Sequence, residues 1–163
     1  NNEFEVKLIA KDKNLDLALL KADLENNNFI QISDQPPKKL QKIIAAGYPF
    51  GKYLSDDIKF TSGIISSLKG IADDSTLLQI DAALNPGNSG GPVVDEETGE
   101  LVAVAVAGLR KDMTESVNFG IKAISVKNFL QSNNFNLALI KKNYNIKSSD
   151  DLSSILEKAT LYT

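Results

Sequence analysis

The residue best suited to chemistry is Ser89, which lies in the segment Ile-Asp-Ala-Ala-Leu-Asn-Pro-Gly-Asn-Ser-Gly-Gly-Pro spanning positions 80–92. Glycines at positions 87, 90 and 91 allow backbone conformations with positive φ, and they leave neighbouring N–H groups free to point at an incoming oxygen. Such N–H groups stabilise the negative charge that develops on a carbonyl during acyl transfer. The segment therefore predicts a serine nucleophile. The alternative is a polar turn without activity, because Gly, Asn, Ser and Pro dominate turns in general.

The same residues also match Gly-x-Ser-x-Gly, the pattern of the sharp turn that holds the nucleophile in α/β-hydrolases. That turn leads into a helix, whereas here Pro92, two valines and a Glu-Glu-Thr-Gly turn follow, and then the apolar run Leu101 to Ala107. This order indicates a strand, a turn and a second strand. The hydrolase pattern also requires a histidine after the serine, and none follows Ser89. The α/β-hydrolase interpretation is therefore set aside.

Several segments, taken in order, resemble trypsin-like serine proteases, and most closely those of the HtrA (Deg) type. Segment 80–92 is similar to the active-site serine segment of that family, and segment 12–21 is similar to its triad-aspartate segment. Segment 46–51, Ala-Gly-Tyr-Pro-Phe-Gly, resembles its turn between two barrels, and segment 61–66 resembles the strand that opens the second barrel. Together these matches extend over roughly residues 5 to 130.

The resemblance implies a serine endopeptidase that works through an acyl-enzyme. In that mechanism Ser89 is the nucleophile, Asp16 orients the base, and the N–H groups of Gly87 and Ser89 donate to the oxyanion. The chemistry needs no metal and no cofactor. Members of the HtrA type commonly degrade or process misfolded proteins, often trimerise, and are mostly periplasmic or secreted. These properties come from the resemblance alone.

A physical interpretation of Asp16 agrees with that role. The run from Leu15 to Leu20 is apolar apart from Asp16, which is typical of a strand that packs into a core. A carboxylate buried beside such a strand needs hydrogen-bond donors, and an imidazole N–H and backbone amides supply them in a Ser-His-Asp arrangement. The alternative is that Asp16 only turns the chain before a core strand.

The sequence contains no histidine, so it lacks the general base that a serine hydroxyl needs. In the resembled family the histidine precedes the aspartate within the first barrel, and only a short segment precedes Asp16 here. We therefore expect the sequence to begin part-way through the protease domain, with the histidine upstream of Asn1. A pseudoenzyme in which the histidine is replaced is the rival hypothesis.

Substrate preference is predicted from the position six residues before the serine, which in trypsin-like folds forms the bottom of the specificity pocket. Ala83 occupies that position and Leu84 follows it, so the pocket should reject Lys and Arg and accept small or aliphatic side chains. The resemblance makes strand 104–108 a pocket wall that pairs with the substrate backbone. The wall residues of that strand are Ala105, Ala107 and Gly108. Phe119 forms the opposite wall.

Length and composition agree with a single globular unit, and the resemblance implies that it acts on protein or peptide substrates. The 163 residues carry a net charge of −3 and are 42% hydrophobic, which is enough chain for one core. No basic stripe is present, which argues against a nucleic-acid partner, and no apolar run is long enough to span a membrane. Disulfides and metal-thiolate sites are excluded because the sequence has no cysteine.

Short apolar runs separated by turn signals predict a mainly β chain, with regular strand spacing that indicates a barrel. The expected strands are Val6–Ala10, Leu17–Lys21, Lys42–Gly47, Phe60–Leu68, Leu77–Ile80, Gly91–Val94, Leu101–Ala107 and Ser116–Ile121. With the resemblance, the prediction is a trypsin-like double barrel: the second barrel and the last part of the first, at residues 1–131. The loop from Leu109 to Ser116 is polar, and in the family this region rearranges between inactive and active forms. Lys122 departs from the family pattern, which has a small residue and a proline near this point.

Residues 132–163 are expected to form a helical C-terminal tail. Before it, Ala123 to Gln131 should form a closing helix. Within the tail, Phe135 to Ile140 is expected as a further short element. Segment 149–159 has helical periodicity, with Leu152 and Leu156 on its apolar face, and Ser148 and Asp151 are spaced as a capping box. The apolar face should pack on the barrel, which is the commoner outcome, or bind a partner.

Two other functional classes stay open. The chain could be a catalytically inactive trypsin-fold module that binds extended peptide segments in the same groove. It could also be a structural fragment that becomes active only after association with its missing N-terminal half or with further copies, because a truncated barrel exposes open strand edges.

Overall fold

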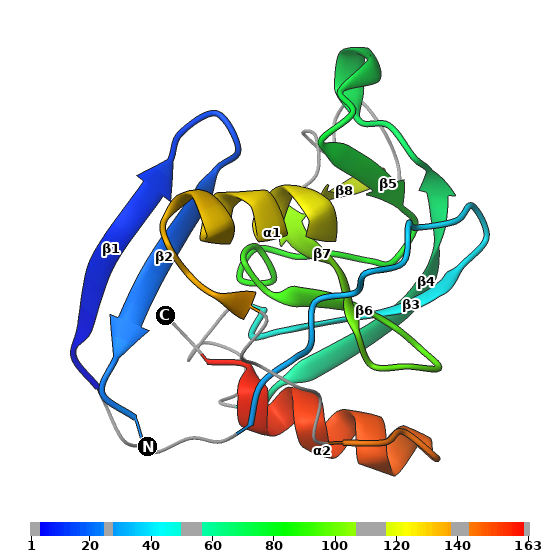
Figure 1. Cartoon of the computed structure of the whole chain (residues 1–163). Helices are drawn as coiled ribbons and strands as arrows, with labels where there is room; N and C mark the ends of the chain where they lie inside the picture. Colours follow the sequence, from blue (N-terminus) through cyan, green and yellow to red (C-terminus); the bar gives the residue numbers. More distant parts are fainter. Residues whose placement is uncertain (1–3, 25–27, 50–56, 107–116, 138–143, 162–163) are drawn as a thin grey trace.

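The computed structural model describes residues 4–24, 28–49, 57–106, 117–137 and 144–161. In this part of the chain, a six-stranded barrel lies beside a separate hairpin, and one helix packs on each of two sides of the barrel (Figure 1). The eight expected strands are all present, with ends that differ by a few residues from the predicted ones. The mainly β prediction is therefore confirmed.

The barrel is closed and antiparallel throughout, with the strand order β3-β4-β5-β8-β7-β6. Its strands are β3 (Lys42–Gly47), β4 (Lys59–Ser67), β5 (Leu77–Ile80), β6 (Pro92–Asp95), β7 (Leu101–Val106) and β8 (Asn118–Lys122). Aliphatic side chains fill the interior, and those of Ile43, Ile65, Leu78 and Val93 are almost fully buried. Closure pairs both edges of every strand, so the barrel is a rigid frame for its loops.

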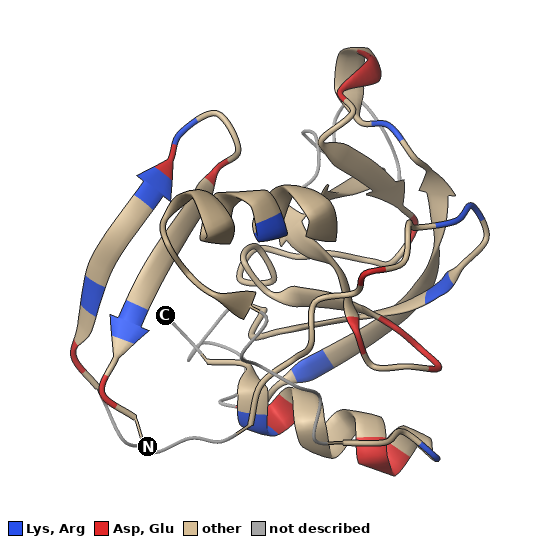
Figure 2. Ribbon diagram, viewed as in Figure 1, with Lys and Arg blue, Asp and Glu red and all other residues tan. Residues whose placement is uncertain are grey.

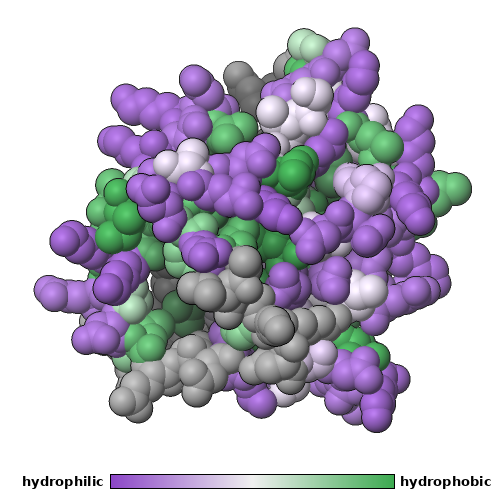
Figure 3. Space-filling view, in the orientation of Figure 1, coloured by the Kyte–Doolittle hydropathy of each residue, from purple (hydrophilic) through white to green (hydrophobic). Residues whose placement is uncertain are grey.

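Strands β1 (Val6–Asp12) and β2 (Leu17–Ala22) form a two-stranded sheet of their own. Asp12 closes the turn, because its Oδ1 accepts hydrogen bonds from the backbone N–H groups of Asn14 (2.9 Å) and Leu15 (3.1 Å). Val6 and Leu8 remain about half exposed, at 52% and 51%, and Figure 3 shows hydrophobic residues at the surface on this side of the molecule.

The expectation that segment 15–20 packs into a core is therefore wrong for β2. Its side chains alternate between half-buried and exposed along most of the strand, with Leu20 42% exposed. The physical reason is the strand count: two strands have two faces and two free edges, and a sheet this small buries apolar side chains only where another element covers them.

Helix α1 (Ala123–Ser132) follows β8 directly and contacts both β7 and β8. Before the barrel, the connecting segment crosses its surface: Ile32 forms a parallel bridge to Leu101, and the ion pair between Asp34 and Lys127 joins this segment to α1. The expected element from Phe135 to Ile140 lies partly outside the described residues.

Helix α2 (Ser149–Ala159) packs on the barrel, as expected for its apolar face. Leu152 and Leu156 form a buried cluster with Ala46, Ile58 and Val94. The hydroxyl of Ser148 accepts a hydrogen bond from the N–H of Asp151 at 3.2 Å, which confirms the predicted cap. The carboxylate of Asp151 accepts in return from the N–H of Lys147 at 2.9 Å, so the cap reaches one residue further than a standard capping box.

Positively and negatively charged residues are interspersed along the hairpin, the barrel and α2 (Figure 2). In the described segments, no helix has the length and apolar character that crossing a membrane requires.

Candidate active site

Ser89 lies in the turn between β5 and β6 and is exposed to solvent. Four backbone hydrogen bonds hold this turn, and in one of them the N–H of Ala105 on β7 donates to the carbonyl of Gly91 (2.9 Å). The N–H of Asn88 donates to the carbonyl of Asn85 (2.9 Å), that of Gly91 to the carbonyl of Asn88 (3.0 Å), and that of Gly90 to the carbonyl of Ala105 on β7 (2.8 Å). Gly87 and Gly90 adopt φ angles of 101° and 82°, which favour glycine. The glycines of the motif thus shape a tight turn that presents the hydroxyl outward.

Two amides of this turn have no acceptor. Within the described residues, neither the N–H of Gly87 nor that of Ser89 donates a hydrogen bond, whereas the other three amides of segment 87–91 all do. These two N–H groups are the ones that the sequence analysis expects as oxyanion donors. Unpaired N–H groups beside a hydroxyl are available to bind a developing oxyanion.

The nucleophile turn (residues 85–91) is pressed against the end of β3. A Cβ atom on Gly47 would lie 2.9 Å from both Cα and Oδ1 of Asn88, and one on Gly91 would overlap the carbonyl oxygen of Ala46. Asn88 is only 3% exposed, and its Oδ1 has no hydrogen-bond partner among the described residues. Steric contact with the end of β3 therefore fixes the position of the turn relative to the barrel.

Sequence reasoning missed Asn88 and Asp81 as structural parts of the site. The carboxylate of Asp81 accepts a hydrogen bond from the N–H of Ile64 (2.6 Å), and the N–H of Asp81 donates back to the carbonyl of Ile64 (3.3 Å). Gly63 leaves room for this contact, because a side chain there would overlap Asp81 and Ala82. The available signal was position, because both residues lie inside segment 80–92, next to the predicted nucleophile and pocket residues.

The described pocket residues come from the segment after β5 and from strands β7 and β8. Ala83 is exposed and Leu84 is 8% exposed, just after β5; Ala105 lies buried on β7 and Phe119 buried on β8. The side-chain amide of Asn118 donates to the carbonyl of Ala82 at 2.8 Å and so ties β8 to the segment that leads to Ser89.

Backbone contacts bring these residues around the nucleophile turn, since Gly90 bonds Ala105 and Phe119 pairs with Val106. Leu84 and Ala105 also belong to the barrel core. Ala107, Gly108 and the loop from Leu109 to Ser116 lie outside the described residues.

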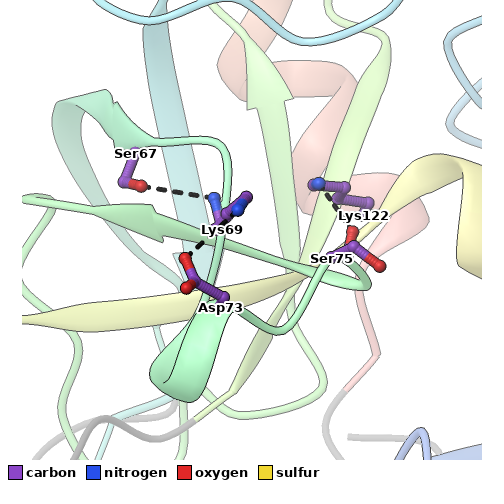
Figure 4. A network of polar contacts seen from close by, with 5 residues as sticks. All are labelled: Ser67, Lys69, Asp73, Ser75 and Lys122. Atoms are coloured by element: carbon purple, nitrogen blue, oxygen red, sulfur yellow. Dashed lines mark hydrogen bonds and ion pairs between the residues drawn. The ribbon is translucent and has the colours of Figure 1, made fainter.

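Lys122 lies at the opposite end of β8 from this site. Asn118 pairs with Ile80 at the end of β5 that leads to Ser89, whereas Lys122 lies beyond the pair of Ile121 with Leu77 at the other end. Its ammonium donates to the carbonyl of Ser75 at 2.6 Å, near the Lys69–Asp73 ion pair (Figure 4). Lys122, where the sequence departs from the family pattern, therefore stabilises a turn at the other end of the barrel from Ser89.

Asp16 lies in the hairpin turn, apart from the barrel sheet that frames Ser89. It is exposed, adopts a φ of 55°, and makes no hydrogen bond or ion pair with the described residues. The expectation of a buried, hydrogen-bonded carboxylate is therefore wrong for this structure. Asp12, four residues earlier, makes the turn-closing contacts, and the two strands that flank the turn at Asp16 pair only with each other in the described part of the chain.

A closed antiparallel barrel with an exposed serine between unpaired amides defines a class, the serine-dependent hydrolases built on a β-barrel. Residues 1–104 match the model of the trypsin-like peptidase domain. The chain belongs to this trypsin-like peptidase family.

Named relatives agree with this assignment. The chain is 34% identical over 137 residues to the serine protease Do-like HtrA of Bacillus subtilis, a match that covers 77% of this chain and 29% of that protein. It is 36% identical over 107 residues to a probable periplasmic serine endoprotease DegP-like of Pseudomonas putida, covering 63% of this chain and 21% of that protein.

A solved structure is also similar. The serine endoprotease from Yersinia pestis matches with a TM-score of 0.68 and 30% identity, over 80% of this chain and 44% of that one. The chain thus spans less than half of the Yersinia chain and less than a third of the two named relatives.

Proposed function

We propose that this chain carries the nucleophile, oxyanion and specificity elements of a serine endopeptidase. The observation that carries the proposal is the pair of unpaired N–H groups, of Gly87 and Ser89, on either side of a turn that exposes the Ser89 hydroxyl. Membership of the trypsin-like peptidase family supports it, and so do the relatives named as serine proteases.

In the proposed reaction, Ser89 Oγ attacks the carbonyl carbon of the scissile peptide bond while its proton passes to a general base. The oxyanion that forms accepts hydrogen bonds from the N–H groups of Gly87 and Ser89. Collapse of the tetrahedral intermediate breaks the C–N bond, the base returns the proton to the leaving amine, and an acyl-enzyme remains. Water activated by the same base then releases the acid and restores Ser89.

The base is proposed to be an imidazole from outside these residues, because the 163-residue sequence contains no histidine. Asp16 is the proposed partner that orients this imidazole. Its free, exposed carboxylate is available for that bond, although the turn that carries it must come close enough to Ser89 for one imidazole to bridge the two side chains.

The proposed substrates are proteins with small or aliphatic residues before the scissile bond. Ala83 and Leu84 place no charge at the bottom of the pocket, so a buried Lys or Arg side chain would have no partner there. Ala105, Ala107, Gly108 and Phe119 are the proposed walls. By analogy with relatives of the HtrA type, we assign the activity to protein quality control or processing, with residues 1–131 as the protease domain and 132–163 as its tail.

Imidazole-supported ester cleavage tests the proposal. We expect the chain alone to hydrolyse an alanyl or valyl peptide ester negligibly, and added imidazole to raise turnover by supplying the missing base. Ser89→Ala should abolish this gain. Ser66→Ala, which changes an exposed serine on β4, should leave it intact. Turnover that survives Ser89→Ala would contradict the assignment of the nucleophile.

A non-catalytic function is the second candidate, and the absence of histidine from the sequence favours it. In that case the chain binds an extended peptide at the proposed substrate site without cutting it. Isothermal titration with an aliphatic peptide would then give binding that is insensitive to Ser89→Ala, and mass spectrometry would show an intact peptide even with imidazole present.

A further inference from the structure

The apolar face of α2 supports the strand that contacts the nucleophile turn. Leu156 is 1% exposed and Leu152 is 6% exposed, and both pack with Ala46 at the end of β3 and with Val94 on β6. In Figure 1, α2 lies beneath the barrel, along the side formed by β3 and β4. Truncation of either leucine would leave a cavity in the cluster that contains Ala46.

A hydrogen bond also connects α2 to Tyr48, two positions after Ala46. The hydroxyl of Tyr48, which directly follows β3, donates to the carbonyl of Thr160, the residue that ends α2, at 3.4 Å. Burial raises the pKa of Tyr48, and the negative charges of Asp57 and Glu157 raise it further. The hydroxyl therefore keeps its proton and remains a donor at neutral pH.

The end of β3 in turn fixes the nucleophile turn. The Ala46 carbonyl lies where a side chain on Gly91 would be, and Gly47 lies under the buried side chain of Asn88. Contacts therefore run without a gap from Leu156 through Ala46 and Gly47 to Asn88, the residue before Ser89.

We propose that α2 is a positioning element of the site. By packing against the end of β3, it holds the Ser89 turn in the position that catalysis requires. This inference rests on the proposed function of Ser89 and adds to it, since α2 lies beyond residues 1–104 that match the family model. Displacement of α2 allows the end of β3 to move and makes the turn more mobile. The C-terminal tail therefore controls how well ordered the two oxyanion donors are.

Hydrogen–deuterium exchange of backbone amides tests this coupling without any chemistry at Ser89. In Leu156→Ala, the hydrogen-bonded amides of Asn88, Gly90 and Gly91 should exchange about tenfold faster or more. The reason is that local opening of the turn costs less free energy when α2 packs less tightly against β3. Amides in the β5–β8 ladder, such as those of Leu78 and Gly120, should change much less. Leu156→Met should restore slow exchange, and Asp150→Asn, an exposed change on the same helix, should have no effect.

Tyr48→Phe is the second variant, for the case in which Leu156→Ala does not fold. It removes only the hydroxyl that bonds Thr160 and should speed exchange at the same three amides by about two- to fivefold. Equal acceleration at the turn and in the β5–β8 ladder would show that α2 merely stabilises the barrel, and would overturn the inference. Unchanged exchange at the turn in the folded variants would also overturn it.

Ester cleavage separates this inference from the proposed function. If Ser89 is the nucleophile, Leu156→Ala should lower the imidazole-supported kcat while KM stays near that of the parent chain, since the oxyanion donors act in the transition state. If the turn loosens in the exchange experiment but no variant shows Ser89-dependent cleavage, the positioning role stands and the peptidase function fails.

Discussion

At the scale of single residues, the site depends on side chains that are absent as much as on those that are present. Gly47 and Gly91 let the nucleophile turn rest directly on β3, and Gly87 and Gly90 let it adopt positive φ angles. Ser89 is exposed because Asn88 beside it occupies the buried position. The hydroxyl and its amides are therefore set by backbone contacts that few other residues permit.

Gly47→Ala tests this steric account. The new Cβ would meet Cα of Asn88 at 2.9 Å, a backbone atom that can move only with the whole turn. We expect a loss of about 1–3 kcal/mol in the free energy of unfolding, as for other overpacked sites. Chemical denaturation measures the loss, and Ser62→Ala, an exposed change on the neighbouring strand β4, is the control. A stability equal to that of the parent chain would mean that the turn is not held by β3.

At the scale of elements, side chains join strands that are distant in sequence. Tyr144 shows this for the tail: its hydroxyl donates to the carbonyl of Gly99 (3.0 Å) and accepts from the N–H of Gln31 (3.1 Å). Asp95 does the same at the end of β6. Its carboxylate accepts from the side-chain amide of Gln41 (2.8 Å) and from the N–H groups of Glu97 (2.9 Å) and Thr98 (2.8 Å).

The Asp95 carboxylate should make stability depend on pH. Burial alone would raise its pKa, but the hydrogen bonds from Gln41, Thr98 and Glu97 outweigh burial and lower it. A group with a lowered folded-state pKa stabilises the fold above its unfolded pKa of about 4, and this contribution is lost as pH falls through the folded value.

Asp95→Asn should therefore cost about 1 kcal/mol at pH 7, after allowance for solvent screening, and progressively less toward pH 3. Thermal melts of the variant and the parent chain from pH 7 to pH 3 give this difference. Glu97→Gln is the matched control, because Glu97 is exposed on the same turn. A difference between Asp95→Asn and the parent chain that does not change with pH would refute the assigned cause.

At the scale of the whole molecule, local patterns predicted the barrel well. Short apolar runs bounded by turn residues placed β3 and β5 to the residue and β8 to within two residues, because strand-forming residues and turn residues are both local signals. The cap at Ser148 was equally readable, since its partners are only three residues apart.

Features that depend on distant contacts could not be predicted. The burial of Asn88 depends on Gly47, about forty positions earlier in the chain, and the exposure of Asp16 depends on which elements cover the hairpin. Apolar runs such as segment 15–20 look alike whether a third strand joins them or not. For the same reason, the pocket residues were placed by family resemblance and not by pattern.

The hairpin carries a consequence for how the protein behaves at high concentration. Among the described residues, each of its strands pairs only with the other, and Val6, Leu8 and Leu20 are exposed. Unpaired strand edges with exposed apolar side chains promote aggregation. Lys7 lies directly opposite Lys21 in the ladder. Two like charges side by side destabilise the hairpin slightly. They also repel the strand of a second molecule and so reduce aggregation.

Salt should therefore convert a clear solution into a turbid one. Raising NaCl from about 0.05 M to about 0.5 M shortens the screening length severalfold, which removes the lysine repulsion and leaves the apolar edges free to meet. Static light scattering should report growing particles, and Leu8→Lys should suppress them. A particle size that does not change with ionic strength would show that lysine repulsion at the hairpin does not control aggregation. In storage and in crystallisation, low ionic strength is then the condition that keeps the molecules apart.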